Sequence, residues 1–137
     1  MLRITPTEGA AWDVAVGQAG WARTPNPAHI AVLSDYTGFV LDVVEHRVVV
    51  ERVGTIRITE DERHDLVLLV RETDVTAVGH DGIRWSSDRL AWDDLKVVAI
   101  ESDRIVLTGY LGDFTHDRVA IDPRDGRQLS GPRVADF

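Results

Sequence analysis

Five histidines and three groups of carboxylates are the residues of this sequence that could perform acid–base or metal chemistry. The histidines are His29, His46, His64, His80 and His116. No two of them lie within four residues of each other, so the sequence contains no local zinc-binding pair. Each histidine is therefore predicted to be a turn or surface residue, and a site that assembles from distant residues remains the alternative.

Carboxylates gather at residues 60–62, at Asp93-Asp94, and at Asp113 with Asp117. Calcium needs six to eight oxygens, usually from alternating positions of one loop, whereas the segment 113–117 offers two carboxylates. A pair of carboxylates could serve a glycosidase, but their separation in space decides that reaction. We expect solvated turns at these positions, with no metal and no cofactor.

Motifs that bind nucleotides or activate a serine are absent. The sequence has no Gly-x-x-x-x-Gly-Lys, no Gly-x-Gly-x-x-Gly and no Gly-x-Ser-x-Gly. It also has no cysteine, which excludes disulfides, thiol catalysis and cysteine-bound zinc. No catalytic residue is therefore predicted.

Aromatic residues in two glycine-containing segments are the candidate binding residues. Trp21 lies in a predicted loop, residues 17–27, and Tyr110, Phe114 and His116 lie in the segment 109–117. Loops that carry aromatic side chains on a rigid β scaffold are common binding sites. The alternative is that Tyr110 and Phe114 close one end of the core.

Two further tryptophans, Trp85 and Trp92, flank the segment Ser86–Asp88. We expect them to pack as a cross-strand pair of one hairpin. A face that stacks against a sugar or another ligand is the alternative. Trp12 is expected in the core.

Short apolar or alternating runs separated by turn residues predict the fold that must position these residues. The runs include Thr55–Thr59, Leu66–Val70, Val75–Val78, Arg89–Trp92, Val97–Ile100, Arg104–Thr108 and Arg118–Ile121. They predict an all-β fold, a single antiparallel meander that forms a β-sandwich or a curved sheet closing as a barrel. Leu66–Val70 is apolar at every position, which predicts a central strand covered on both faces. Asp81-Gly82 predicts a type I′ hairpin turn.

One domain is expected to span residues 1–137, because this length matches the usual domain size. Residues 1–28 show no single pattern. Within them the segment Gly9–Gly17 favours a strand, with a helix as the alternative. Residues 132–137 are predicted to form a frayed tail.

The net charge is −8, from 23 acidic and 15 basic residues. This balance argues against nucleic acid as a partner, because nucleic-acid binding needs clustered positive charge. No run approaches the length of a membrane span, and the N-terminus lacks the apolar core of a signal peptide. A cytoplasmic location is therefore expected.

The segment Ala120-Ile-Asp-Pro-Arg-Asp-Gly-Arg-Gln-Leu129 resembles the closing hairpin of blade repeats in PQQ-type β-propellers. Those repeats favour Ala-x-Asp-x-x-Thr-Gly-Lys; here Asp125 replaces the usual threonine and the later tryptophan is missing. Residues 34–42 and 81–85 also look blade-like. The resemblance implies blade-like units with room for about three, and it carries over no cofactor residue. The whole chain is also similar to small uncharacterised all-β proteins of high-GC bacteria, a likeness that implies no activity.

These features favour a non-catalytic, cytoplasmic β domain that binds a protein or a ligand. One alternative is a hydrolase whose carboxylates and histidines meet in space. Another is an architectural, blade-like unit that acts through homo-oligomerisation and so covers its edge strands.

Overall fold

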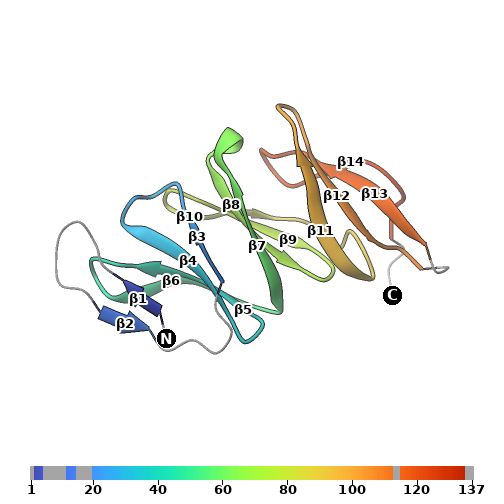
Figure 1. Ribbon diagram of the computed structural model, residues 1–137. Helices are drawn as coiled ribbons and strands as arrows, with labels where there is room; N and C mark the ends of the chain where they lie inside the picture. Colours follow the sequence, from blue (N-terminus) through green and yellow to red (C-terminus); the bar gives the residue numbers. More distant parts are fainter. Residues whose placement is uncertain (1, 5–11, 15–19, 113–114, 135–137) are drawn as a thin grey trace.

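Three four-stranded antiparallel sheets make up most of the computed structural model, which describes residues 2–4, 12–14, 20–112 and 115–134 (Figure 1). The first sheet contains β3 (Gly20–Arg23), β4 (His29–Ser34), β5 (Thr37–Asp42) and β6 (Arg47–Val53). The second contains β7 (Thr55–Asp61), β8 (Leu66–Arg71), β9 (Val75–Gly79) and β10 (Gly82–Ser86). The third contains β11 (Asp93–Ile100), β12 (Ile105–Tyr110), β13 (His116–Ile121) and β14 (Gln128–Ser130). The predicted all-β fold is confirmed.

Two short elements complete the described structure. β1 (Leu2–Ile4) pairs with β2 (Trp12–Val14) as a separate two-stranded sheet, and η1 (Glu62–His64) is a single 3-10 turn. No helix in the described part of the chain is long and apolar enough to cross a membrane.

Each four-stranded sheet is a meander in which the strands follow the order of the sequence. The first strand of the second sheet, β7, contacts β3 of the first sheet and β11 of the third. The sheets pack through their faces, as in a sandwich, and the second lies between the other two. No barrel closes among the described strands.

The strand β8 is buried on both faces, as its continuous apolar sequence predicts. Leu66, Leu68 and Val70 belong to the core shared with the third sheet. Val67 and Leu69 belong to the core shared with the first sheet. Successive side chains of a strand point to opposite faces, so an apolar residue is needed at every position when both faces are covered.

The hairpin at Asp81-Gly82 differs from the predicted type I′ turn. Gly79 pairs with Gly82, so the turn residues are His80 and Asp81, and neither has a positive φ. Gly82 has φ +124° and follows the turn, next to an irregularity in the pairing with β9. The segment with positive φ at both central residues is Asp35-Tyr36, between β4 and β5.

Two predicted segments are wrong. Residues 20–23 of the predicted loop form the edge strand β3, because Ala22 is buried against the second sheet and its neighbours pair with β4. The tertiary pairing therefore overrides the nearby glycine and proline signals. Residues 89–92 form no strand and instead connect the second sheet to the third. The strand favoured near Trp12 is present as β2, and residues 132–134 are irregular.

The expected pairing of Trp85 with Trp92 is also wrong. Trp85 lies on β10, is 8% exposed, and its Nε1 donates a hydrogen bond of 2.9 Å to the carbonyl oxygen of Pro123. Trp92 lies in the connection before β11 and is 48% exposed. Trp85 belongs to a strand of the second sheet and Trp92 to the connection that leads into the third, so no hairpin brings them opposite each other.

We expect Trp85→Ala to lower the free energy of unfolding by about 3–5 kcal/mol, because it removes a large buried side chain and its hydrogen bond. The matched change Trp92→Ala should cost less than about 1 kcal/mol, because half of that side chain already meets water. Urea denaturation followed by circular dichroism measures both. Equal losses of stability would contradict the different positions of the two residues.

Candidate functional site

The structure brings together two of the four predicted binding residues. Tyr110 ends β12 and His116 begins β13, where they form a register pair. Their ring centroids lie 5.6 Å apart and the rings are tilted by 56°. Phe114 lies outside the described residues. Trp21 lies on β3, in the first sheet, and has no place in this cluster.

A chain of polar contacts fixes the orientation of His116. Its Nε2 lies 3.1 Å from Oδ2 of Asp94 on β11. Oδ1 of the same carboxylate accepts a hydrogen bond of 3.3 Å from Nη2 of Arg57 on β7. Nη1 of Arg57 also donates to the carbonyl oxygen of Leu95 at 3.0 Å. These contacts tie the second sheet to the third beside the predicted binding residues.

The carboxylate of Asp94 is the centre of this chain. The hydrogen bonds from His116 and then from Arg57 hold the pKa of Asp94 below its ordinary value, although burial acts in the opposite direction. The side chains of His116 and Asp94 are 54% and 47% exposed, so water screens the pair. The arrangement can therefore present fixed charge to a partner, but it does not enclose a reacting group.

Trp92 extends the cluster toward solvent. Its backbone N–H donates to the carbonyl oxygen of Tyr110 at 2.8 Å. Its indole ring lies about 3.9 Å from where a Cβ on Gly112 would be. The backbone N–H of Thr115 donates to the carbonyl oxygen of Gly112 at 3.0 Å, which closes the adjacent turn. We call the residues Arg57, Trp92, Asp94, Tyr110 and His116 the Tyr110 surface.

Sequence reasoning missed three members of the Tyr110 surface. Asp94 was expected only as part of a solvated acidic pair, Trp92 was expected to pack against Trp85, and Arg57 carried no distinguishing signal. Arg57 and His116 are 59 positions apart in the sequence. Their contact with one carboxylate depends on how two sheets pack, and no local spacing encodes that packing.

The remaining candidate binding residue, Trp21, is 60% exposed on the edge strand β3. It is the register partner of Val32 on β4, and Val32 is buried in a small cluster of the first sheet. Trp21 is therefore an exposed tryptophan on a different sheet from the Tyr110 surface.

Three more histidines contact carboxylates. His29 lies 3.6 Å from Asp42, and His80 lies 2.9 Å from the neighbouring Asp81. His64 lies 2.7 Å from the buried Asp61. Within the described ranges, no group of three or more metal-ligating side chains is assembled. His80 and Asp81 make a local turn contact, whereas His29 and Asp42 are register partners on β4 and β5.

His64 links the second sheet to the third. Its Nδ1 faces Oδ2 of Asp61, and its Nε2 lies 3.0 Å from the carbonyl oxygen of Ser102 in the turn between β11 and β12. Both partners only accept, so the protonated imidazolium satisfies both contacts. Burial lowers the pKa of His64. The hydrogen bonds to the Ser102 carbonyl and the Asp61 carboxylate raise it by more than burial lowers it, so the pKa lies above its ordinary value.

This raised pKa predicts how stability depends on pH. The contribution of His64 to the free energy of unfolding should be complete below its ordinary pKa of about 6.5, and should be lost as the pH rises through the raised value in the folded state. We expect the stability difference between the parent protein and His64→Gln to be largest near the acid end of a titration by urea denaturation. It should shrink toward alkaline pH.

The control for this titration is His80→Gln, which removes a 62% exposed histidine. We expect little stability difference for this variant at any pH. A stability difference for His64→Gln that grows toward alkaline pH would contradict the geometry.

The contacts of His116 bear on the hydrolase alternative. Among the described residues, no serine or threonine hydroxyl is hydrogen-bonded to its ring. Two hollows among the described residues are lined by other residues, and neither lining set includes a histidine. In the part of the chain that the structure describes, the Asp94–His116 pair therefore has neither the nucleophile of a triad nor a hollow around it.

No known protein-family model matches this chain, and a search of curated proteins finds no significant match.

Proposed function

We propose that this protein is a non-catalytic binding module that contacts a protein partner through the Tyr110 surface. The observation that carries the proposal is the tilted Tyr110–His116 ring pair, to which the 48% exposed Trp92 is joined by the hydrogen bond from its backbone N–H to the carbonyl oxygen of Tyr110. Tryptophan, tyrosine and arginine dominate the energetic centres of protein interfaces. The Tyr110 surface contains one of each.

The rigidity of the surface supports the same function. Tyr110 and His116 lie at the ends of paired strands. Asp94 on β11 contacts His116, and Arg57 on β7 in turn holds Asp94. Side chains that are already fixed lose little conformational entropy on binding. The exposed carboxylate and guanidinium beside the aromatic rings can make directional polar contacts at the rim of an interface.

The test compares partner capture by the immobilised protein and by a Trp92→Ala/Tyr110→Ala variant. Captured proteins are quantified by mass spectrometry, and the most enriched one is purified and titrated by calorimetry. We expect the double variant to weaken binding of that partner by about tenfold or more, because each replacement removes a large aromatic contact.

Trp21→Ala is the matched control, because it removes an exposed tryptophan from the first sheet. It should leave the affinity within about twofold of the parent, since surface positions outside an interface contribute little. If the partner binds the double variant as tightly as the parent, or is lost only with Trp21→Ala, the Tyr110 surface is not the binding site.

An architectural function is the second candidate, and a repeated turn favours it. A buried aspartate stands at the end of the third strand in both the first and the third sheet: Asp42 is the last residue of β5, and Asp122 directly follows β13. Oδ1 of Asp42 accepts hydrogen bonds from the backbone N–H groups of Val44 and Glu45, and Oδ1 of Asp122 accepts one from that of Arg124. The repetition supports equivalent, blade-like units.

Each of these turns also has a residue with positive φ four positions after the aspartate. His46 has φ +56° and Gly126 has φ +77°. Closed propellers contain about four to eight such units, so three would need additional sheets from another copy. In this reading, self-association stacks the outer sheets of two chains.

Light scattering coupled to gel filtration separates the two candidates. The binding proposal expects a mass near 15.2 kDa for the protein alone, whereas two-copy assembly expects twice that mass. A stable, concentration-independent dimer would make the architectural function the better one.

A further inference from the structure

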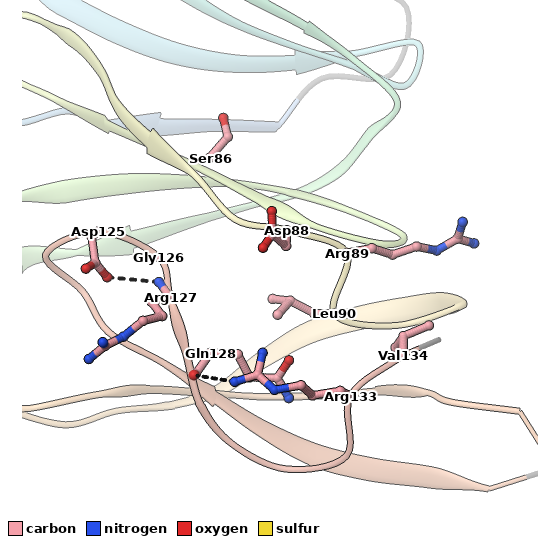
Figure 2. A pocket seen from close by; sticks show the side chains of 10 residues that line it. All are labelled: Ser86, Asp88, Arg89, Leu90, Asp125, Gly126, Arg127, Gln128, Arg133 and Val134. Carbon is pink, nitrogen blue, oxygen red and sulfur yellow. Dashed lines mark hydrogen bonds between the residues drawn. The ribbon is translucent and has the colours of Figure 1, made fainter. Parts of the chain in front are cut away.

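A polar cleft opens between the second and third sheets, in a different place from the Tyr110 surface. Its volume is about 890 Å³. One wall is the connection that follows β10, and the other is the hairpin between β13 and β14, with residues 133–134 at one end (Figure 2). The lining residues are Ser86, Asp88, Arg89, Leu90, Asp125, Gly126, Arg127, Gln128, Arg133 and Val134.

The hairpin wall is held rigidly against the core. Trp85 donates its Nε1 hydrogen to the carbonyl oxygen of Pro123, at 2.9 Å. A Cβ added to Gly126 would lie only 2.4 Å from the ring of Trp85, so the backbone rests directly on the indole. Oδ1 of Asp125 accepts a 2.9 Å hydrogen bond from the backbone N–H of Arg127. The backbone position of Arg127 is therefore set by the fold.

The end of the cleft is also ordered by hydrogen bonds. Nε2 of Gln128 lies within hydrogen-bond distance of the carbonyl oxygens of Ser130, Gly131 and Pro132, the shortest at 2.9 Å. Nη2 of Arg133 donates to the carbonyl oxygen of Gln128 at 3.4 Å. Figure 2 shows the Arg133 guanidinium beside Gln128, across the cleft from Asp88.

The side chains that line the cleft carry a net positive charge, whereas the whole chain is negative. Three arginines and two aspartates line it, whereas the chain carries a net charge of −8. Arg127 and Arg133 form no ion pair with any described residue. The neighbouring Arg124 differs, because its Nη2 lies 2.8 Å from Oδ2 of Asp122.

That neighbouring pair is already neutralised. The hydrogen bonds from Arg124 lower the pKa of Asp122 to about 2, so the carboxylate stays charged. It forms an ion pair with the Arg124 guanidinium. No described carboxylate forms an ion pair with Arg127 or Arg133, although the charge of Arg127 also helps to lower the pKa of Asp122. Guanidinium forks bind carboxylate and phosphate oxygens through two parallel hydrogen bonds.

We propose that this cleft binds a ligand carrying several carboxylate groups, with Arg127 and Arg133 as the residues that hold its oxygens. Its volume is within the usual range of small-molecule sites, about 300–1,000 Å³. Such carboxylates occur on small polycarboxylic acids and on acidic peptide segments. The guanidinium groups recognise the same chemistry in both.

Calorimetry at low salt with citrate and with a hexaglutamate peptide as separate probes tests this site and distinguishes the two sources. We expect saturable binding of at least one probe. An Arg127→Gln/Arg133→Gln variant should weaken that binding by about tenfold or more, because it removes both guanidinium groups that would hold the ligand. Thermal unfolding of the variant should match the parent, because both side chains are exposed.

Arg63→Gln/Arg118→Gln is the matched control, because it removes the same charge from exposed positions outside the cleft. This control should change the affinity by no more than about twofold, an effect of net charge alone. An Arg127→Lys/Arg133→Lys variant keeps the charge and should bind with intermediate affinity, since lysine lacks the fork.

The proposal is overturned if neither probe binds saturably. It is also overturned if the cleft variant and the Arg63→Gln/Arg118→Gln control weaken binding equally, because the probe would then be attracted by the overall charge and not held at this cleft. Equal binding by the parent and the cleft variant would also overturn it. Binding of citrate alone would assign a small-molecule ligand, and binding of hexaglutamate alone would assign an acidic peptide.

Discussion

The burial of both faces of β8 is the constraint on which the rest of the structure depends. Val67 and Leu69 contribute to the core with the first sheet, and Leu66, Leu68 and Val70 contribute to the core with the third. Each such side chain stabilises the folded state by roughly 1.5–3 kcal/mol relative to its exposed state. A polar residue at any of these positions would lose its hydrogen bonds to water and destabilise the fold. The packing of the second sheet against both the first and the third therefore depends on this one five-residue run.

Apolar packing alone does not fix how the third sheet is placed on the second. Three side chains of the second sheet and its connections reach carbonyl oxygens of the third: Arg57 reaches Leu95, His64 reaches Ser102 and Trp85 reaches Pro123. Hydrogen bonds are directional, whereas apolar contact is not. These contacts therefore set the position from which the Tyr110 surface and the cleft are built.

The fold class could be predicted because strand patterning is local. The continuous apolar run at residues 66–70 identified β8, and the alternating runs identified β7, β9, β12 and β13. The edge strand β3 was missed because only Ala22 carries its core face, among glycine and proline signals. Residues 89–92 were assigned to a strand in error, since Leu90 and Ala91 are buried in a connection rather than in a sheet.

The candidate sites were predictable only where their parts are adjacent in sequence. Tyr110 and His116 flank one turn, so glycine and aromatic residues marked that segment. Arg57 and Asp94 could not be assigned, because their contact requires two sheets to pack in one particular way. The polar cleft could not be predicted either, because its two walls are far apart in the sequence and are brought together by the packing of Trp85 against the hairpin that contains Gly126.

The positions of the two proposed sites follow from the path of the connection between Trp85 and Trp92. Trp85 and Trp92 are separated by seven positions, yet one is buried between sheets and the other is half exposed. The connection between them must leave the second sheet, cross the core at Leu90 and Ala91, and enter the third. It therefore forms a wall of the cleft at its beginning and supports the Tyr110 surface at its end, so one connection built to join two sheets also shapes both exposed sites.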